Sequence, residues 1–428
     1  MTTVLEIRVV DPRLIGALCV LSIGALAFLL VRRRPAPWPL WAGVAAAAGA
    51  ATAAAFALVA KLTGVFGMAL PWQAVAWGAI GLAATGVAVA NFWRARWGRR
   101  VVAGASIALF VLTTGLGINA YYGLNTTLAS LLNIQLERPI EVPTPSPHSD
   151  SGTPLYQSWT APADMPAVGE QGTIEIPATQ SQFSARLAGI YKPPAAMTSN
   201  PPVLPLVIMM MGQPGDPDPQ YIAKVLDAQA QKHGGLAPYV LVVDQLGDPD
   251  KDPACADSAM YGNVETYVTK DVVAFARTLP VQQQPGQWVI AGYSNGGGCA
   301  FKYAAEHPDV WGNLLSVSGE IVPGSEHPDE TIADVFGGSS SAYDAAKPSS
   351  ILTSGVVTYP HEWALFTAGE NDPGYIDQAR LGAAAAAAAG WQADSYVVPG
   401  AGHVGDALDG GLAEGFARLY PRLGLSAP

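Results

Sequence analysis

The stretch from residue 288 to residue 300, "WVIAGYSNGGGCA", decides which fold the sequence predicts. It begins with an apolar run rich in β-forming residues and passes through three glycines into a helical pattern. The pentapeptide GYSNG at 292–296 matches the pattern G-x-S-x-G. This pattern needs a strand before it and a helix after it, because its serine occupies a sharp turn in which side chains at the glycine positions would collide with neighbouring backbone. Ser294 is therefore the candidate nucleophile, and the alternative is a glycine-rich turn after a buried strand.

Strand and helix patterns alternate on both sides of this stretch. The expected strands are "GTIEIPA", "SARLAGIYKP", "LPLVIMMM", "YVLVVDQL", "WVIAGY", "NLLSVSG", "WALFTAG" and "ADSYVVPG". Helices are expected near 219–233, near 264–279, from 295, near 375–390 and over a last segment ending at 423, with an irregular excursion through "GGSSSAY". Such alternation predicts an α/β fold with a mostly parallel sheet and helices on both faces.

The first part of the chain has a different character. Half of the 428 residues are hydrophobic, only 13% are charged, and the mean hydropathy is +0.23. Four apolar segments, at about 14–31, 39–60, 74–92 and 101–121, each approach the roughly 20 residues that cross a bilayer as a helix. Buried core helices are the alternative, but four such segments in sequence with almost no internal charge favour a transmembrane bundle. Many glycines and alanines favour close helix packing, as in a membrane anchor.

Charge predicts how this bundle is oriented. Basic clusters lie at 32–34 and 94–100, whereas the loop between the second and third segments holds only Lys61. Positive loops stay cytoplasmic, so the chain after Tyr122 is expected on the extracytoplasmic side of the cell membrane. Residues 1–140 carry 11 basic against 3 acidic side chains, and the remainder carries 12 against 31. An acidic outer part argues against nucleic acid as a partner.

Composition divides the chain into three expected parts. Residues 1–122 form the four-helix transmembrane anchor. A linker rich in proline and serine, which includes "ERPIEVPTPSPHSDSGTP", covers 123–171. The β/α pattern then covers 172–428. The expected organisation is thus a membrane anchor, a linker and one enzymatic domain.

A serine hydroxyl needs a base to take its proton, and in sheets of this kind the order is Ser, then Asp or Glu, then His. Of six histidines, only His403 follows every candidate acid, in "VVPGAGHVGDAL". Its alternative role is a surface histidine near a helix start. The acid is expected in "WALFTAGENDPGY", which offers Glu370 and Asp372. Asp372 is favoured because it lies in the turn beyond the strand, where it can reach sideways, and Glu370 stays open.

Acyl transfer also needs two N–H groups that face the negative oxygen of the tetrahedral intermediate. One is expected from the residue after the nucleophile, Asn295. The other is expected from the loop "MMMGQPGDPD" after the strand at 204–211, where Gln213 is the candidate. Because only backbone atoms are required, the side chains at these positions carry little information.

The outer part, from about Gly172 to the end, resembles the Putative esterase family of α/β-hydrolases, which includes esterase D and the antigen 85 mycolyltransferases. It is most similar to actinobacterial members with several membrane helices before the hydrolase domain. The resemblance rests on "GYSNGGGCA", "MGQPG", "ACADSAMYGNVETYVTKDVVAF", "GENDP" and "GAGH". It implies an α/β-hydrolase fold, a triad of Ser294, Asp372 and His403, and an oxyanion hole from the amides of Gln213 and Asn295. The sequence departs from the family pattern at Met211, where many members have histidine. Antigen 85 proteins use a glutamate as the acid, which keeps Glu370 as a candidate.

Cysteine positions predict one covalent cross-link. Cys19 lies in a membrane segment and is expected to be a small apolar residue. Cys255 and Cys299 lie in the outer part, one after the fourth strand and one behind the nucleophile turn, in an oxidising compartment. We expect a disulfide between them that braces the active-site wall, and the alternative is two buried thiols. No cofactor and no metal are expected, since the acidic loop "DQLGDPDKDPACAD" lacks the spacing of a calcium loop.

These features together predict a membrane-anchored serine hydrolase that cleaves carboxylic esters through an acyl-enzyme. An ester substrate is expected as its partner, with an envelope lipid as one candidate. An acyltransferase that passes the acyl group to a sugar or lipid hydroxyl is the alternative within the same chemistry. A catalytically inactive, membrane-tethered binding module is the alternative from another class, and the occupied catalytic positions argue against it.

Overall fold

The computed structural model describes residues 2–31, 37–63, 70–93, 95–123, 125–132, 134, 136–141 and 153–428. The chain forms two compact units, Met1–Leu136 and Glu137–Pro428. Their boundary lies inside the predicted linker 123–171, of which residues 124, 133, 135 and 142–152 lie outside the described residues. Within that predicted linker, short helices form at Leu128–Leu131 (α6) and Leu155–Ser158 (α7), and the first strand already begins at Glu170.

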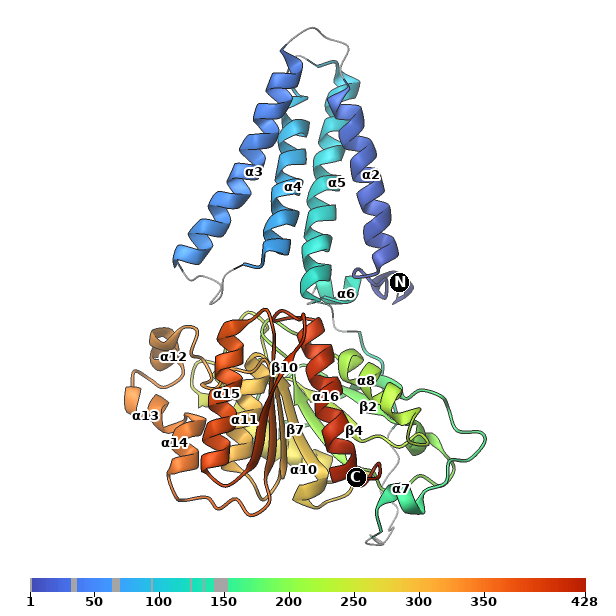
Figure 1. Cartoon of the computed structure of the whole chain (residues 1–428), viewed down its shortest axis with the longest axis vertical. Coiled ribbons are helices and arrows are strands. Elements are labelled where there is room, and N and C mark those ends of the chain that lie inside the picture. Colours follow the sequence, from blue (N-terminus) through green and yellow to red (C-terminus); the bar gives the residue numbers. More distant parts are fainter. Residues whose placement is uncertain are drawn as a thin grey trace. The chain divides into compact units, whose positions relative to one another are not determined.

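The first unit consists of helices (Figure 1). They are α1 (Thr2–Leu5), α2 (Pro12–Leu30), α3 (Trp38–Thr63), α4 (Trp72–Ala90), α5 (Trp97–Tyr122) and α6. Helices α2 to α5 are long and apolar enough to cross a membrane, and they coincide with the four predicted segments. Glycine brings α3 and α4 close together, since a Cβ on Gly86 would overlap the carbonyl group of Ala45.

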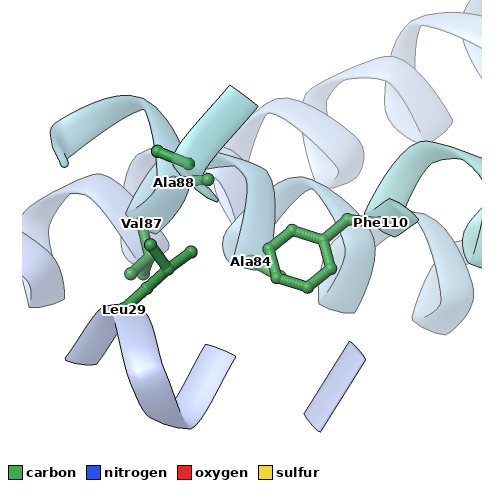
Figure 2. Close-up of a cluster of buried hydrophobic side chains, with 6 residues drawn as sticks. Leu29, Ala84, Val87, Ala88 and Phe110 are labelled. Carbon is green, nitrogen blue, oxygen red and sulfur yellow. The ribbon is translucent and has the colours of Figure 1, made fainter. Parts of the chain in front are cut away.

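Figure 2 shows the apolar packing inside this bundle. Leu29 of α2, Ala84, Val87 and Ala88 of α4, and Phe110 of α5 form one buried cluster, which also includes Ala103. Other large apolar side chains of the bundle, such as Leu40, Ile80 and Val111, are more than half exposed. An apolar outer surface of this kind suits contact with lipid rather than with water.

The second unit is built on an eight-stranded sheet with the order β1-β2-β4-β3-β7-β8-β9-β10. Its strands are β1 (Glu170–Ile174), β2 (Ala188–Lys192), β3 (Leu206–Met210), β4 (Tyr239–Val243), β7 (Trp288–Tyr293), β8 (Asn313–Val317), β9 (Trp363–Gly369) and β10 (Gln392–Val398). β2 pairs antiparallel with β1 and β4, and all other pairs are parallel. A separate two-stranded ribbon joins β5 (Asp257–Ser258) to β6 (Gly262–Asn263).

Helices cover both faces of this sheet (Figure 1). They are α8 (Gln220–Ala230), α9 (Val264–Thr266), η2 (Tyr267–Val272), α10 (Val273–Ala276), α11 (Asn295–Glu306), α12 (Pro328–Asp334), α13 (Ser340–Ala345), α14 (Pro348–Thr353), α15 (Pro373–Ala388) and α16 (Asp406–Arg422), with short turns η1 (Pro194–Met197) and η3 (Pro285–Gln287). The expectation of an irregular excursion through "GGSSSAY" was wrong in part. Residues 337–339 form a turn, but residues 340–343 begin α13, which lies between α12 and α14.

Two glycines show that α15 and α16 lie on opposite faces. Gly382 of α15 approaches the ring of Phe366, and Gly411 of α16 approaches the hydroxyl of Thr367. Successive side chains of a strand point to opposite faces, so these neighbours on β9 assign the two helices to different sides. The central strands are therefore covered on both faces, and β3, β4, β7 and β8 are buried throughout.

Candidate active site

The nucleophile candidate lies in a strained turn. Ser294 follows β7 and precedes α11, with φ 52° and ψ −120°. A Cβ on Gly292 would overlap the carbonyl group of Gly296, and a Cβ on Gly296 would overlap that of Met210. The glycines of G-x-S-x-G are thus required by close backbone approach, while Ser294 itself adopts a conformation that costs on the order of 1–3 kcal/mol.

Backbone hydrogen bonds hold this turn in place. The N–H of Ser294 donates to the carbonyl oxygen of Val317 on β8 at 2.9 Å. Its carbonyl oxygen accepts from the N–H groups of Gly297 at 2.9 Å and Gly298 at 3.2 Å. The side chain is therefore presented at the carboxyl edge of the sheet by a rigid backbone.

The predicted base and acid meet Ser294 at that edge. His403 lies between β10 and α16, and its Nε2 is 3.1 Å from the Ser294 hydroxyl oxygen. Asp372 follows β9, and its Oδ2 is 2.8 Å from Nδ1 of His403. The two side chains are only 13% and 11% exposed. With the proton on Nδ1, Asp372 accepts from the imidazole and Nε2 is free to accept from the serine hydroxyl.

Glu370, the alternative acid, lies elsewhere. Its Oε2 accepts from the N–H of Gly400 at 2.7 Å, and its side chain is exposed. It stabilises the loop between β10 and His403 rather than contacting the imidazole. The structure therefore brings Asp372, and not Glu370, together with His403.

The two predicted N–H donors belong to segments that meet near Ser294. Asn295 is the first residue of α11. Gln213 follows Gly212, where a Cβ would lie only 3.2 Å from the Cβ of Ser294. Among the described residues, neither amide donates to another protein group. Both donors are therefore adjacent in sequence to residues at the nucleophile, which is compatible with an oxyanion hole.

Tyr375 is a site residue that the sequence analysis missed. Its ring centroid is 4.1 Å from that of His403, and its hydroxyl contacts both the Ser294 side chain and Oε1 of Glu326, the latter at 3.3 Å. Burial raises the pKa of Tyr375, so the phenol stays protonated. Its position three residues after Asp372 in "NDPGY" is the sequence signal that could have identified it.

A disulfide joins Cys255 to Cys299, as the sequence predicts, with 5.2 Å between their Cα atoms. It links the loop after β4 to α11, the helix directly behind the nucleophile. Two carboxylates of the acidic loop have partners within the domain: Asp244 accepts from Arg186, and Asp257 accepts from Thr266. In the part of the chain that the structure describes, no group of three or more candidate ligands could hold a metal ion.

Comparison with known proteins identifies the family. The profile of the Putative esterase family matches residues 190–404, which include Ser294, Asp372 and most of the sheet. The chain belongs to this esterase family. An uncharacterised protein of Corynebacterium glutamicum is 30% identical over 363 residues, which cover 81% of each chain. Membership makes the chain an ester hydrolase of the α/β-hydrolase type, with candidate transmembrane helices before the hydrolase domain.

Solved structures similar to this esterase-family chain include two bacterial hydrolases. An S-formylglutathione hydrolase from Agrobacterium tumefaciens superposes with a TM-score of 0.49 at 15% identity, covering 61% of this chain and 98% of its own. FphF, a fluorophosphonate-binding serine hydrolase of Staphylococcus aureus, superposes with a TM-score of 0.46 at 16% identity, covering 60% and 99%.

Proposed function

We propose that the chain is a membrane-anchored, extracytoplasmic serine esterase that works through a triad of Ser294, His403 and Asp372. The observation that carries the proposal is the unbroken line of hydrogen bonds from the serine hydroxyl through the imidazole to the carboxylate, at 3.1 and 2.8 Å. Serine, base and orienting acid come from three separate connections of one sheet, in the order expected for this fold.

The proposed reaction uses these groups in two half-reactions. Ser294 Oγ attacks the ester carbonyl carbon while His403 Nε2 takes the hydroxyl proton, and Asp372 stabilises the resulting imidazolium. The amides of Gln213 and Asn295 stabilise the negative oxygen of the tetrahedral intermediate. His403 then returns the proton to the departing alcohol, which leaves an acyl group on Ser294. Water, deprotonated by the same imidazole, attacks this acyl-enzyme and releases the acid.

Charge and cysteine chemistry support the proposed location. The basic clusters at 32–34 and 94–100 favour cytoplasmic placement of the α2–α3 and α4–α5 connections, so that the hydrolase domain emerges on the opposite side. A buried disulfide is typical of an oxidising compartment. We propose a division into anchor, linker and hydrolase domain on composition, with the predicted bounds 1–122, 123–171 and 172–428 adjusted so that the hydrolase domain includes all of β1 from Glu170.

The proposed substrate class follows from attachment to a membrane. An enzyme tethered there works at high effective concentration on esters in the same layer. An envelope lipid or a lipid-linked ester is therefore the proposed substrate, with the linker giving the domain its reach.

The experiment measures turnover of p-nitrophenyl esters of rising acyl length by the full chain in detergent. Ser294→Ala should abolish turnover, whereas Ser349→Ala, a substitution on an exposed face of α14, should leave it within about twofold. Equal rates in wild type and Ser294→Ala would rule out the proposed mechanism.

A second experiment tests the location. Protease is added to intact cells that express the chain with a C-terminal tag. The account predicts loss of the tag without cell lysis. A tag that is protected until the cells are lysed would place the domain in the cytoplasm.

A further inference from the structure

The two N–H groups of the proposed oxyanion hole come from separate segments of the chain. Gln213 lies in the loop after β3, and Asn295 begins the helix after β7. The two strands are neighbours, with Met210 opposite Gly292. β3 ends at Met210 and β7 at Tyr293, so both amides lie beyond the strands that carry them. The backbone of Gly296 approaches Met210 and Met211 closely, and side chains add further links between the two segments.

The side chain of Asn295 is one part of that connection. The residue is only 3% exposed, so its carboxamide faces protein rather than solvent. Its Oδ1 accepts from Nε2 of Gln245 at 3.1 Å, and its Nδ2 donates to Oδ1 of Asp252 at 2.9 Å. Both ends of the carboxamide are thus hydrogen-bonded, which fixes the first turn of α11 from the side.

Gln245 connects the two segments directly. It lies just after β4, is 3% exposed, and donates from the same Nε2 to Asn295 and to the carbonyl oxygen of Met211 at 2.5 Å. Met211 is two residues before Gln213 in the loop after β3. One amide nitrogen, with its two hydrogens, therefore bridges the loop that carries one donor and the helix that carries the other.

Asp252 binds the other end of the Asn295 carboxamide, the Nδ2 group. Its Oδ1 also accepts from the N–H of Ala254 at 2.8 Å. Burial raises the pKa of this carboxyl group, and the hydrogen bonds from Ala254 and Asn295 act in the opposite direction. The next cysteine, Cys255, is bonded to Cys299 in α11, so the loop that holds Asp252 is covalently attached to the helix that it braces.

We propose that the side chains of Gln245 and Asn295 are positioning residues that set the spacing of the two oxyanion-hole amides. This inference rests on the proposed function. Donors stabilise the developing oxyanion only when they lie about 2.7–3.1 Å from it, and displacement by about 1 Å can cost on the order of 100-fold in rate. Neither side chain needs to contact the substrate, so their effect is on the transition state and not on substrate binding.

The test compares Gln245→Met and Asn295→Ala in the full chain with wild type. The first keeps side-chain volume and removes both bridging bonds, and the second keeps the Asn295 backbone N–H. Each should lower kcat about 10- to 100-fold with KM within about threefold, and should weaken binding of a trifluoromethyl ketone by a similar factor. The apparent pKa in the kcat/KM profile should not move, because the network does not touch His403.

Asn313→Ala is the matched control. Asn313 is 1% exposed and its Nδ2 also donates to two carbonyl oxygens, those of Gly286 and Trp288, but at the opposite ends of the strands. It should lower thermal stability and leave kcat within about threefold. A general effect of losing buried hydrogen bonds would instead lower kcat in all three variants.

The outcomes separate this inference from the proposed function. Ser294→Ala, measured in parallel, shows whether turnover depends on the nucleophile. If it does, and both Gln245→Met and Asn295→Ala keep kcat within about threefold of wild type, the positioning role is refuted and the esterase mechanism stands. If circular dichroism shows that Gln245→Met does not fold, Asn295→Ala alone tests the positioning role, and a kcat within about threefold of wild type refutes it.

Discussion

Asp372→Asn should lower kcat for a p-nitrophenyl ester by about 10³- to 10⁴-fold. The carboxylate oxygen is 2.8 Å from Nδ1 of His403, and both side chains are nearly buried. Placing the two charges about 4 Å apart at an effective dielectric constant of about 20 gives an attraction of about 4 kcal/mol for the imidazolium formed during attack. That free energy corresponds to roughly a thousandfold in rate.

The asparagine adds a second penalty. Its Nδ2 group can donate to Nδ1 of His403, which favours the tautomer with the proton on Nε2. An imidazole in that tautomer cannot accept the Ser294 proton. The loss should therefore reach the upper end of the range, while KM changes little, because Asp372 contacts the histidine and not the substrate.

Glu370→Gln is the matched control for this prediction. It removes a charge two residues away, on a side chain whose partner is the N–H of Gly400. We expect kcat within about threefold of wild type. A loss below tenfold for Asp372→Asn, or an equal loss for Glu370→Gln, would refute the assignment of the acid.

Three further predictions concern neighbouring features. Tyr375→Phe keeps the ring against His403 but removes the hydroxyl, which contacts the Ser294 side chain and donates to Glu326. The kcat should fall about 2- to 12-fold with a small loss of thermal stability, and an unchanged rate would contradict a role for the hydroxyl. Replacing Cys255 and Cys299 by serine removes a disulfide between residues 44 positions apart in the sequence. The free energy of unfolding in urea should fall by about 4 kcal/mol, because the unfolded chain is no longer constrained. A fall below about 1 kcal/mol would contradict this account. Burial raises the pKa of Glu306 from 4.5 to about 7, so between these pH values the folded chain holds a proton that the unfolded chain releases, and the stability of the wild type falls as pH rises. The melting temperature of Glu306→Gln should therefore rise relative to that of the wild type from pH 4.5 to 7. Parallel curves for the two proteins would refute the shift.

The sheet and the catalytic order could be predicted because each follows from local physics. A strand covered on both faces is mostly apolar, which makes "LVIMM" and "WVIAGY" recognisable. Glycines at 292 and 296 are required by backbone contacts in the turn, so the motif by itself indicates a sharp turn between a strand and a helix. The chain order of serine, acid and histidine then left His403 as the candidate base and Glu370 and Asp372 as the candidate acids.

Other features depend on contacts between distant segments. Gln245 bridges Met211 and Asn295, and nothing in its local sequence indicates that its carboxamide is buried between a loop and a helix. Tyr375 follows the acid closely, but its contact with Ser294 depends on how α15 begins. Helix α13 has a serine-rich sequence that is also typical of loops, and it is capped by the Ser339 side chain, so its composition alone favoured irregular structure.

The most direct test of Ser294 as the nucleophile is covalent labelling of the full chain in detergent with a fluorophosphonate, followed by peptide mass spectrometry. The account predicts one adduct, on the peptide that contains Ser294, and its absence from Ser294→Ala, with strong suppression in His403→Ala. An unlabelled wild-type protein with native circular dichroism, or an adduct that persists in Ser294→Ala, would contradict it.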